Sequence, residues 1–98
     1  MIGIQIRAQV EADRRYELMQ MCNNWLALNH LPPACLERHV YQDTIAPNDL
    51  LLVEQWSDEA QMNSYLSSDR FRALLGAVKV LGKLVHVCTC EARFVEGG

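Results

Sequence analysis

Hydrophobic and polar residues alternate at the start of the chain. Ile2, Ile4, Ile6 and Ala8 occupy every second position, with polar residues or glycine between them. A period of two is typical of a β-strand with one apolar face. The pattern therefore predicts a first strand over residues 2–9.

The spacing of hydrophobic residues changes over residues 13–29. There they recur at intervals of three and four, as Leu18, Cys22 (or Met21), Trp25 and Leu28. This spacing predicts an amphipathic helix with one face toward a core. Pro32 and Pro33 cannot continue a helix, so it ends before them.

The middle of the chain has the pattern of a β-hairpin. Over residues 35–43 one face of a strand would carry Leu36, Arg38, Val40 and Gln42, and the other Cys35, Glu37, His39 and Tyr41. Residues 45–49 are turn-forming, and residues 50–56 are almost continuously apolar before they end in Glu54, Gln55 and Trp56. Such an apolar strand is expected to be central and covered on both faces.

Two helix start signals follow the hairpin. Ser57 or Asp58 can cap a helix that runs to about residue 66, and Ser68 with Asp69 precedes a second periodic segment that ends near Gly82. We therefore expect a helix that is broken near residue 67. Residues 84–95 are rich in β-forming residues and predict an unusually long last strand.

The order of these elements predicts an α+β fold. Strand, helix, strand, strand, helix, strand is the ferredoxin-like βαββαβ sandwich, in which two helices cover one face of a four-stranded antiparallel sheet. Residues 1–98 are expected to form this single domain. Because several strands carry apolar residues on both of their faces, a lone subunit would expose apolar sheet surface. We therefore expect a homodimer that pairs face to face, with the end of the last strand reaching across.

Composition and charge narrow the function. Half of the 98 residues are hydrophobic, and 9 Lys and Arg against 12 Asp and Glu leave a net charge of -3. The scattered basic residues argue against nucleic acid or an anionic membrane as a partner. The chain lacks both a run of about 18 apolar residues and a secretion signal, so we expect a cytoplasmic protein. A core of this size needs no disulfide, and the four cysteines are expected to be free.

Three sequence segments suggest a family. LLVEQWSDEA at residues 51–60 and YLSSDRF at residues 65–71 resemble the third strand and the following helix of the antibiotic-biosynthesis monooxygenase family. PACL at residues 33–36 is similar to that family's Pro-Gly-Cys-Leu, with Ala34 in place of the glycine. The similarity covers nearly the whole chain. It implies a dimeric α/β barrel (the ferredoxin-like sandwich paired with a second copy) and a pocket between each subunit's sheet and helices.

The resemblance implies several activities, because known members include cofactor-free oxygenases of quinols or anthrones, haem-degrading enzymes and an isomerase. Haem-degrading relatives use a His, an Asn and a Trp where this chain has Leu75, Ile6 and Tyr65. That comparison disfavours haem breakdown.

The oxygenases match the chain better. Anthrone-oxidising relatives use an Asn, a Tyr and an Arg where this chain has Leu52, Met62 and Gly76, and share only Trp56. Quinol-oxidising relatives carry the same Glu-Gln-Trp and a His near the position of Tyr65. A quinol-type reaction therefore stays open.

The residues themselves provide candidate chemistry. Glu54 and Trp56 share a strand face with Leu50 and Leu52, so both could point toward the helices. A buried Glu needs a partner or a raised pKa, in an active site or in a structural ion pair, and a buried Trp is more often core. The neutral imidazole of His39 could act as a general base, although a strand His is more often structural.

Polar residues on the first and last strands could also take part in chemistry. Arg7 could neutralise a substrate anion or pair with Glu37 or Glu54. His86, Cys88 and Cys90 share one strand face, but Cys-x-Cys inside a strand is not the usual zinc spacing, and we expect no metal.

These observations favour a monooxygenase that needs no cofactor and oxidises a small electron-rich aromatic, of the quinol or anthrone type. In this hypothesis Trp56 and Tyr65 orient the substrate, and His39 or Glu54 takes its proton. A second hypothesis is a non-catalytic or ligand-sensing dimeric barrel that has lost the polar residues of the family. A haem-binding protein is a third hypothesis.

Overall fold

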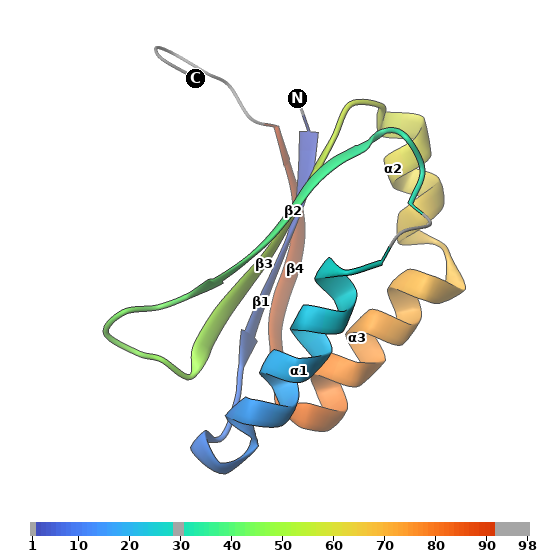
Figure 1. The fold of residues 1–98 in the computed structure, drawn as a ribbon. Coiled ribbons are helices and arrows are strands. Elements are labelled where there is room, and N and C mark those ends of the chain that lie inside the picture. Colours follow the sequence, from blue (N-terminus) through green and yellow to red (C-terminus); the bar gives the residue numbers. More distant parts are fainter. Residues whose placement is uncertain (1, 29–30, 92–98) are drawn as a thin grey trace.

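The chain forms one antiparallel sheet with helices on one of its faces (Figure 1). A computed structural model describes residues 2–28 and 31–91. The strands are β1 (Ile2–Gln9), β2 (Cys35–Gln42), β3 (Asp49–Trp56) and β4 (Lys83–Glu91). The helices are η1, a short 3₁₀ turn (Ala12–Arg14), α1 (Arg15–Leu26), α2 (Glu59–Leu66) and α3 (Asp69–Leu81). The predicted ferredoxin-like α+β fold is confirmed.

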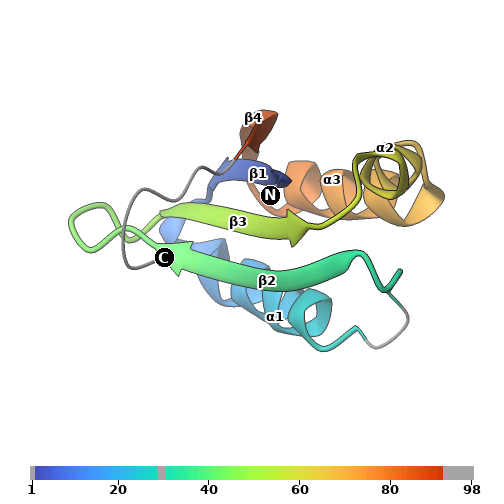
Figure 2. The same ribbon diagram turned by 90° about the horizontal axis from the view of Figure 1, so that it is seen from above.

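The strand order is β2-β3-β1-β4, so β1 and β3 are central. Both central strands are antiparallel to each neighbour, and Ile6 pairs with Leu52 across the middle of the sheet. Figure 2 shows α1 and α3 side by side beneath the sheet, with α2 near the end of β3. No helix among the described residues is both long and apolar enough to cross a bilayer.

The core lies between the sheet and the helices because β1 and β3 each turn one face toward the helices. The inward-facing side chains of these two strands are almost fully buried: Ile4, Ile6, Ala8, Leu50, Leu52, Glu54 and Trp56. The helices contribute Leu18, Cys22, Trp25, Met62, Tyr65, Phe71, Leu74 and Val78. Glu54 is the one charged residue in the described part of the chain that is buried as a whole residue.

The predicted break between the last two helices is present, and each helix has its own cap. Asp58 Oδ1 accepts a hydrogen bond from the amide of Gln61 at 3.0 Å and begins α2. Ser68 Oγ accepts one from the amide of Phe71 at 3.2 Å and begins α3. These bonds satisfy amides that lack partners inside a helix, so α2 and α3 are separate helices.

The sequence predictions and the structure differ at the end of α1, at the faces of β3 and in the span of the last strand. The first long helix ends at Leu26 rather than near residue 29, because the chain must leave it before Pro32 and Pro33 and return to the sheet. β3 is central, and within one chain the helices cover only one of its faces, since Leu51 and Val53 on the other face remain half-buried. The last strand ends at Glu91, and residues 92–95 of its predicted span lie outside the described residues.

Candidate functional site

A buried ion pair lies between the sheet and α1. Glu54 projects from β3 toward the helices, and Arg38 lies opposite it on β2. Arg38 Nε donates to Glu54 Oε2 at 2.9 Å, and the two side chains are 5% and 1% exposed. Burial raises the pKa of Glu54, although the Arg38 guanidinium acts in the opposite direction.

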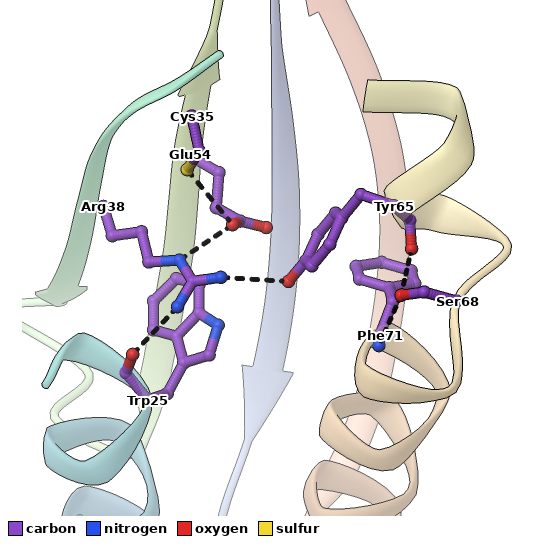
Figure 3. A network of polar contacts seen from close by, with 7 residues as sticks. All are labelled: Trp25, Cys35, Arg38, Glu54, Tyr65, Ser68 and Phe71. Atoms are coloured by element: carbon purple, nitrogen blue, oxygen red, sulfur yellow. Dashed lines mark hydrogen bonds and ion pairs between the residues drawn. The ribbon is translucent and has the colours of Figure 1, made fainter. Parts of the chain in front are cut away.

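The three guanidinium nitrogens of Arg38 link its own strand, β2, to β3, α1 and α2 (Figure 3). Nη1 donates to the carbonyl oxygen of Trp25 at 2.9 Å, and Nη2 donates to the hydroxyl of Tyr65 at 3.3 Å. The guanidinium also lies over the Trp25 ring, 4.8 Å from its centroid, which is a cation–π contact. The Trp25 carbonyl is available because it belongs to the last turn of α1, where carbonyls lack full helical partners.

Cys35 completes the network at the start of β2. Its Sγ lies 3.8 Å from Glu54 Oε2, and an irregularity between Cys35 and Glu37 shifts the register there. Burial, and then the neighbouring carboxylate, raise the pKa of the Cys35 thiol. The sulfur is therefore a weak hydrogen-bond donor here and a poor nucleophile.

Tyr65 forms the α2 side of the network. Its ring packs against Trp56 and Phe71, with ring centroids 5.1 and 5.2 Å away. Burial, and then the Glu54 carboxylate, raise the pKa of the Tyr65 hydroxyl above its ordinary value. The hydroxyl therefore stays protonated at neutral pH, where it can donate or accept a hydrogen bond but does not serve as a base.

A pocket of about 820 Å³ has Tyr65 in its lining. It is formed by the segment before β2, by α2 and by the start of α3. Its lining residues are Leu31, Pro32, Ala60, Gln61, Ser64, Tyr65, Ser68 and Arg70. Its size suits a small organic molecule, and Tyr65 is common to the pocket and to the buried network.

The sequence matches the family model for antibiotic biosynthesis monooxygenases over residues 1–76. The chain belongs to the antibiotic biosynthesis monooxygenase family. Among curated proteins nothing matches it.

Several solved structures share the fold of this chain. One, from Deinococcus radiodurans, is a candidate antibiotic biosynthesis monooxygenase at 21% identity and a TM-score of 0.82, with 97% of this chain and 95% of that chain covered. A conserved protein from Methanosarcina mazei has 20% identity and a TM-score of 0.79, with 94% and 92% covered. A variant of SnoaB, a cofactor-independent oxygenase from Streptomyces nogalater, has 13% identity and a TM-score of 0.73, with 99% and 97% covered.

The antibiotic biosynthesis monooxygenase fold brings three of the four predicted site residues together. Glu54, Trp56 and Tyr65 are buried in one cluster between the sheet and the helices. The structure does not bring His39 to them, because His39 lies on the opposite face of the sheet. Its side chain is 46% exposed there, and its Nε2 is 3.2 Å from Glu37.

Arg7 and the polar residues of β4 also lie on the open face of the sheet. Arg7 is exposed there, and the partner of Glu54 is Arg38 instead. His86, Cys88 and Cys90 are exposed on β4, and no group of three or more metal-binding side chains occurs within residues 2–28 and 31–91. All four cysteines of the chain are free.

Sequence reasoning missed Arg38 and gave Trp25 only a packing role. Both residues contact the polar network directly. The signal for Arg38 was in the hairpin, since pairing outward from the turn places it opposite Glu54.

Proposed function

We propose that this protein is a cofactor-independent monooxygenase that oxidises a small electron-rich aromatic, of the quinol or anthrone type. The observation that supports this is a buried Glu54 paired with Arg38, which also donates to Tyr65, a residue that lines an 820 Å³ pocket. Such a reaction asks little of the protein beyond binding the substrate anion and excluding water.

In the proposed reaction the substrate supplies the electrons. Its O–H or acidic C–H proton passes to Glu54, and the resulting anion reduces dioxygen directly. One oxygen atom enters the substrate and the other leaves as water, so a quinol becomes a hydroxyquinone and an anthrone becomes a quinone. The Arg38 guanidinium keeps positive charge beside the anion, and the rings of Trp56 and Tyr65 orient the substrate.

The raised pKa of Glu54 suits this role. A carboxylate with an ordinary pKa is a weak base toward a phenol, and burial strengthens it. The Arg38 guanidinium lowers the pKa of Glu54 against the effect of burial, which favours the ionised form that can accept a proton.

Oxygen uptake with simple quinols and anthrones tests the proposal. We expect consumption above the rate of buffer alone, and a loss of about a hundredfold or more in Glu54→Gln, as for removal of a general base. Glu17→Gln makes the same change at an exposed carboxylate and should leave the rate unaltered. No uptake by folded wild-type protein refutes the proposal. Loss of uptake in His39→Gln but not in Glu54→Gln would assign the proton to His39 instead.

A second function has one observation in its favour. The positions where anthrone-oxidising relatives carry polar residues hold buried Leu52 and Met62 and the half-buried Gly76. A barrel that binds or senses an aromatic ligand without turnover would need no more than this. It predicts saturable ligand binding with no oxygen uptake.

We also propose that two chains pair through the open face of the sheet. Leu51 and Val53 are half-buried there and Tyr41 is 53% exposed, which is an unusual amount of apolar surface for a sheet facing water. Sedimentation should give a dimer at micromolar concentration, and Val53→Lys should dissociate it. A monomeric wild type refutes the pairing. The four free cysteines support a location in the cytoplasm, where thiols stay reduced.

A further inference from the structure

Three buried polar atoms around the Arg38–Glu54 pair have no hydrogen-bond partner among the described residues. They are Trp25 Nε1, Glu54 Oε1 and Trp56 Nε1. The residues that carry them are 5%, 1% and 0% exposed. Buried polar groups are nearly always paired, so their presence in one cluster calls for an occupant.

Two of the three atoms flank the hydroxyl of Tyr65. Glu54 and Trp25 both lie close enough to that hydroxyl to shift its pKa, Glu54 upward and Trp25 downward. Figure 3 shows the Trp25 indole nitrogen, the unpaired Glu54 oxygen and the Tyr65 hydroxyl directed toward the same space beside Arg38. Trp25 Nε1 carries a hydrogen and is a donor, whereas Glu54 Oε1 on the carboxylate is an acceptor.

A hydroxyl group is the complement of this pair, because its oxygen accepts one hydrogen bond and its proton donates another. The side chain that now reaches between the two atoms is itself a phenol. It belongs to Tyr65, which is also part of the pocket wall. A phenol that entered from the pocket would meet the same two polar atoms once the Tyr65 side chain had turned aside and released its bond to Arg38.

We propose that Trp25 and Glu54 bind one phenolic hydroxyl of the ligand in the place of the Tyr65 hydroxyl. The ligand O–H donates to Glu54 Oε1, and the ligand oxygen accepts from Trp25 Nε1–H. This rests on the proposed function for its substrate class, and it makes Trp25 a substrate-positioning residue. When the proton passes to Glu54, the carboxylate becomes a neutral carboxylic acid and the phenol becomes a phenolate. The indole N–H and the Arg38 guanidinium then face the phenolate oxygen.

Binding can be measured without turnover by comparing 1-naphthol with its methyl ether, 1-methoxynaphthalene. The chain has two tryptophans, so a ¹⁵N–¹H spectrum has two indole signals, and Trp25→Phe assigns them. We expect 1-naphthol to shift the Trp25 signal saturably downfield. The ether leaves Glu54 Oε1 buried without a partner and should bind about tenfold more weakly.

The variant provides the second measurement. Trp25→Phe keeps an aromatic ring near the Arg38 guanidinium but removes the N–H, so it should weaken 1-naphthol about fivefold. The ether oxygen can also accept from that N–H, so the ether should weaken too, and the preference for 1-naphthol, which depends on Glu54, should remain. Equal affinity for the two ligands, or a Trp25 signal that neither moves, would mean that these atoms hold only water and would overturn the proposal.

The results separate this proposal from the proposed reaction. Selective 1-naphthol binding with no oxygen uptake from quinols keeps the phenol site and rejects the monooxygenase. Oxygen uptake with no response of the Trp25 signal rejects the phenol site alone.

Discussion

Removing Arg38 should destabilise the protein strongly, because Glu54 would remain buried without its counter-ion. Arg38→Met keeps an unbranched chain against the Trp25 ring but loses all three hydrogen bonds of the guanidinium. Breaking a buried pair by deleting one partner costs about 3–5 kcal/mol. Urea unfolding at one fixed protein concentration measures the loss, since the stability of the proposed dimer would depend on concentration.

Two matched variants test the cause of that loss. Arg38→Met combined with Glu54→Leu removes both charges and should recover most of the lost stability, because apolar residues can replace a buried pair at little cost. Arg72→Met breaks an ion pair whose side chains are 72% and 99% exposed, and should cost less than about 1 kcal/mol.

The stability lost in Arg38→Met should also depend on pH, and the pKa of Glu54 determines whether the loss grows or shrinks as the pH rises. Burial raises its pKa in the folded chain above the ordinary 4.5, so its contribution to stability is complete below 4.5 and is lost as the pH rises through the folded value. Without Arg38 the folded pKa of Glu54 rises further. Arg38→Met should therefore cost less at pH 5 than at pH 8. An equal cost at both pH values, or a double variant no more stable than the single one, would refute this account.

Three further predictions concern packing, capping and thiol reactivity. Gly3→Ala should destabilise by about 1–3 kcal/mol because its Cβ would lie 2.8 Å from the backbone oxygen of Glu54, whereas Gly76→Ala meets open space within α3 and should stabilise by about 0.5–1 kcal/mol in the same urea assay. Ser68→Ala removes the cap of α3 and should lower stability by about 1 kcal/mol, with Ser68→Asp restoring it. The Cys22 thiol, whose pKa burial raises to about 11, should resist a disulfide reagent at pH 8 until the protein unfolds; labelling as fast as at an exposed cysteine would contradict its burial.

The sequence predicted the central strands well because one of their faces is almost wholly apolar. Glu54 and Trp56 share a face of β3 with Leu50 and Leu52, which predicted that they could point toward the helices, where the structure has them. The break between α2 and α3 was also predictable, since Ser68 is a strong capping residue at the start of a new apolar periodicity.

The edge strand β2 could not be predicted in the same way. Its two faces are both partly polar, so periodicity does not tell which one is buried, and His39 and Arg38 were equally eligible. The turn holds the missing information. Pairing Gln42 with Leu50 beyond the turn brings Val40 to Leu52 and Arg38 to Glu54. The role of the Trp25 carbonyl depends on where α1 ends, which the sequence placed about one turn too late.

Because α2 is a separate, short helix with its own cap, its exposed side can change in sequence while its buried side stays the same. One side of this eight-residue helix anchors it through buried Met62 and Tyr65, while its exposed Ala60, Gln61 and Ser64 line the pocket. Exchanges at those three positions would alter which molecules fit without touching the interior. Selection could therefore retune ligand preference across related proteins while the scaffold stays the same.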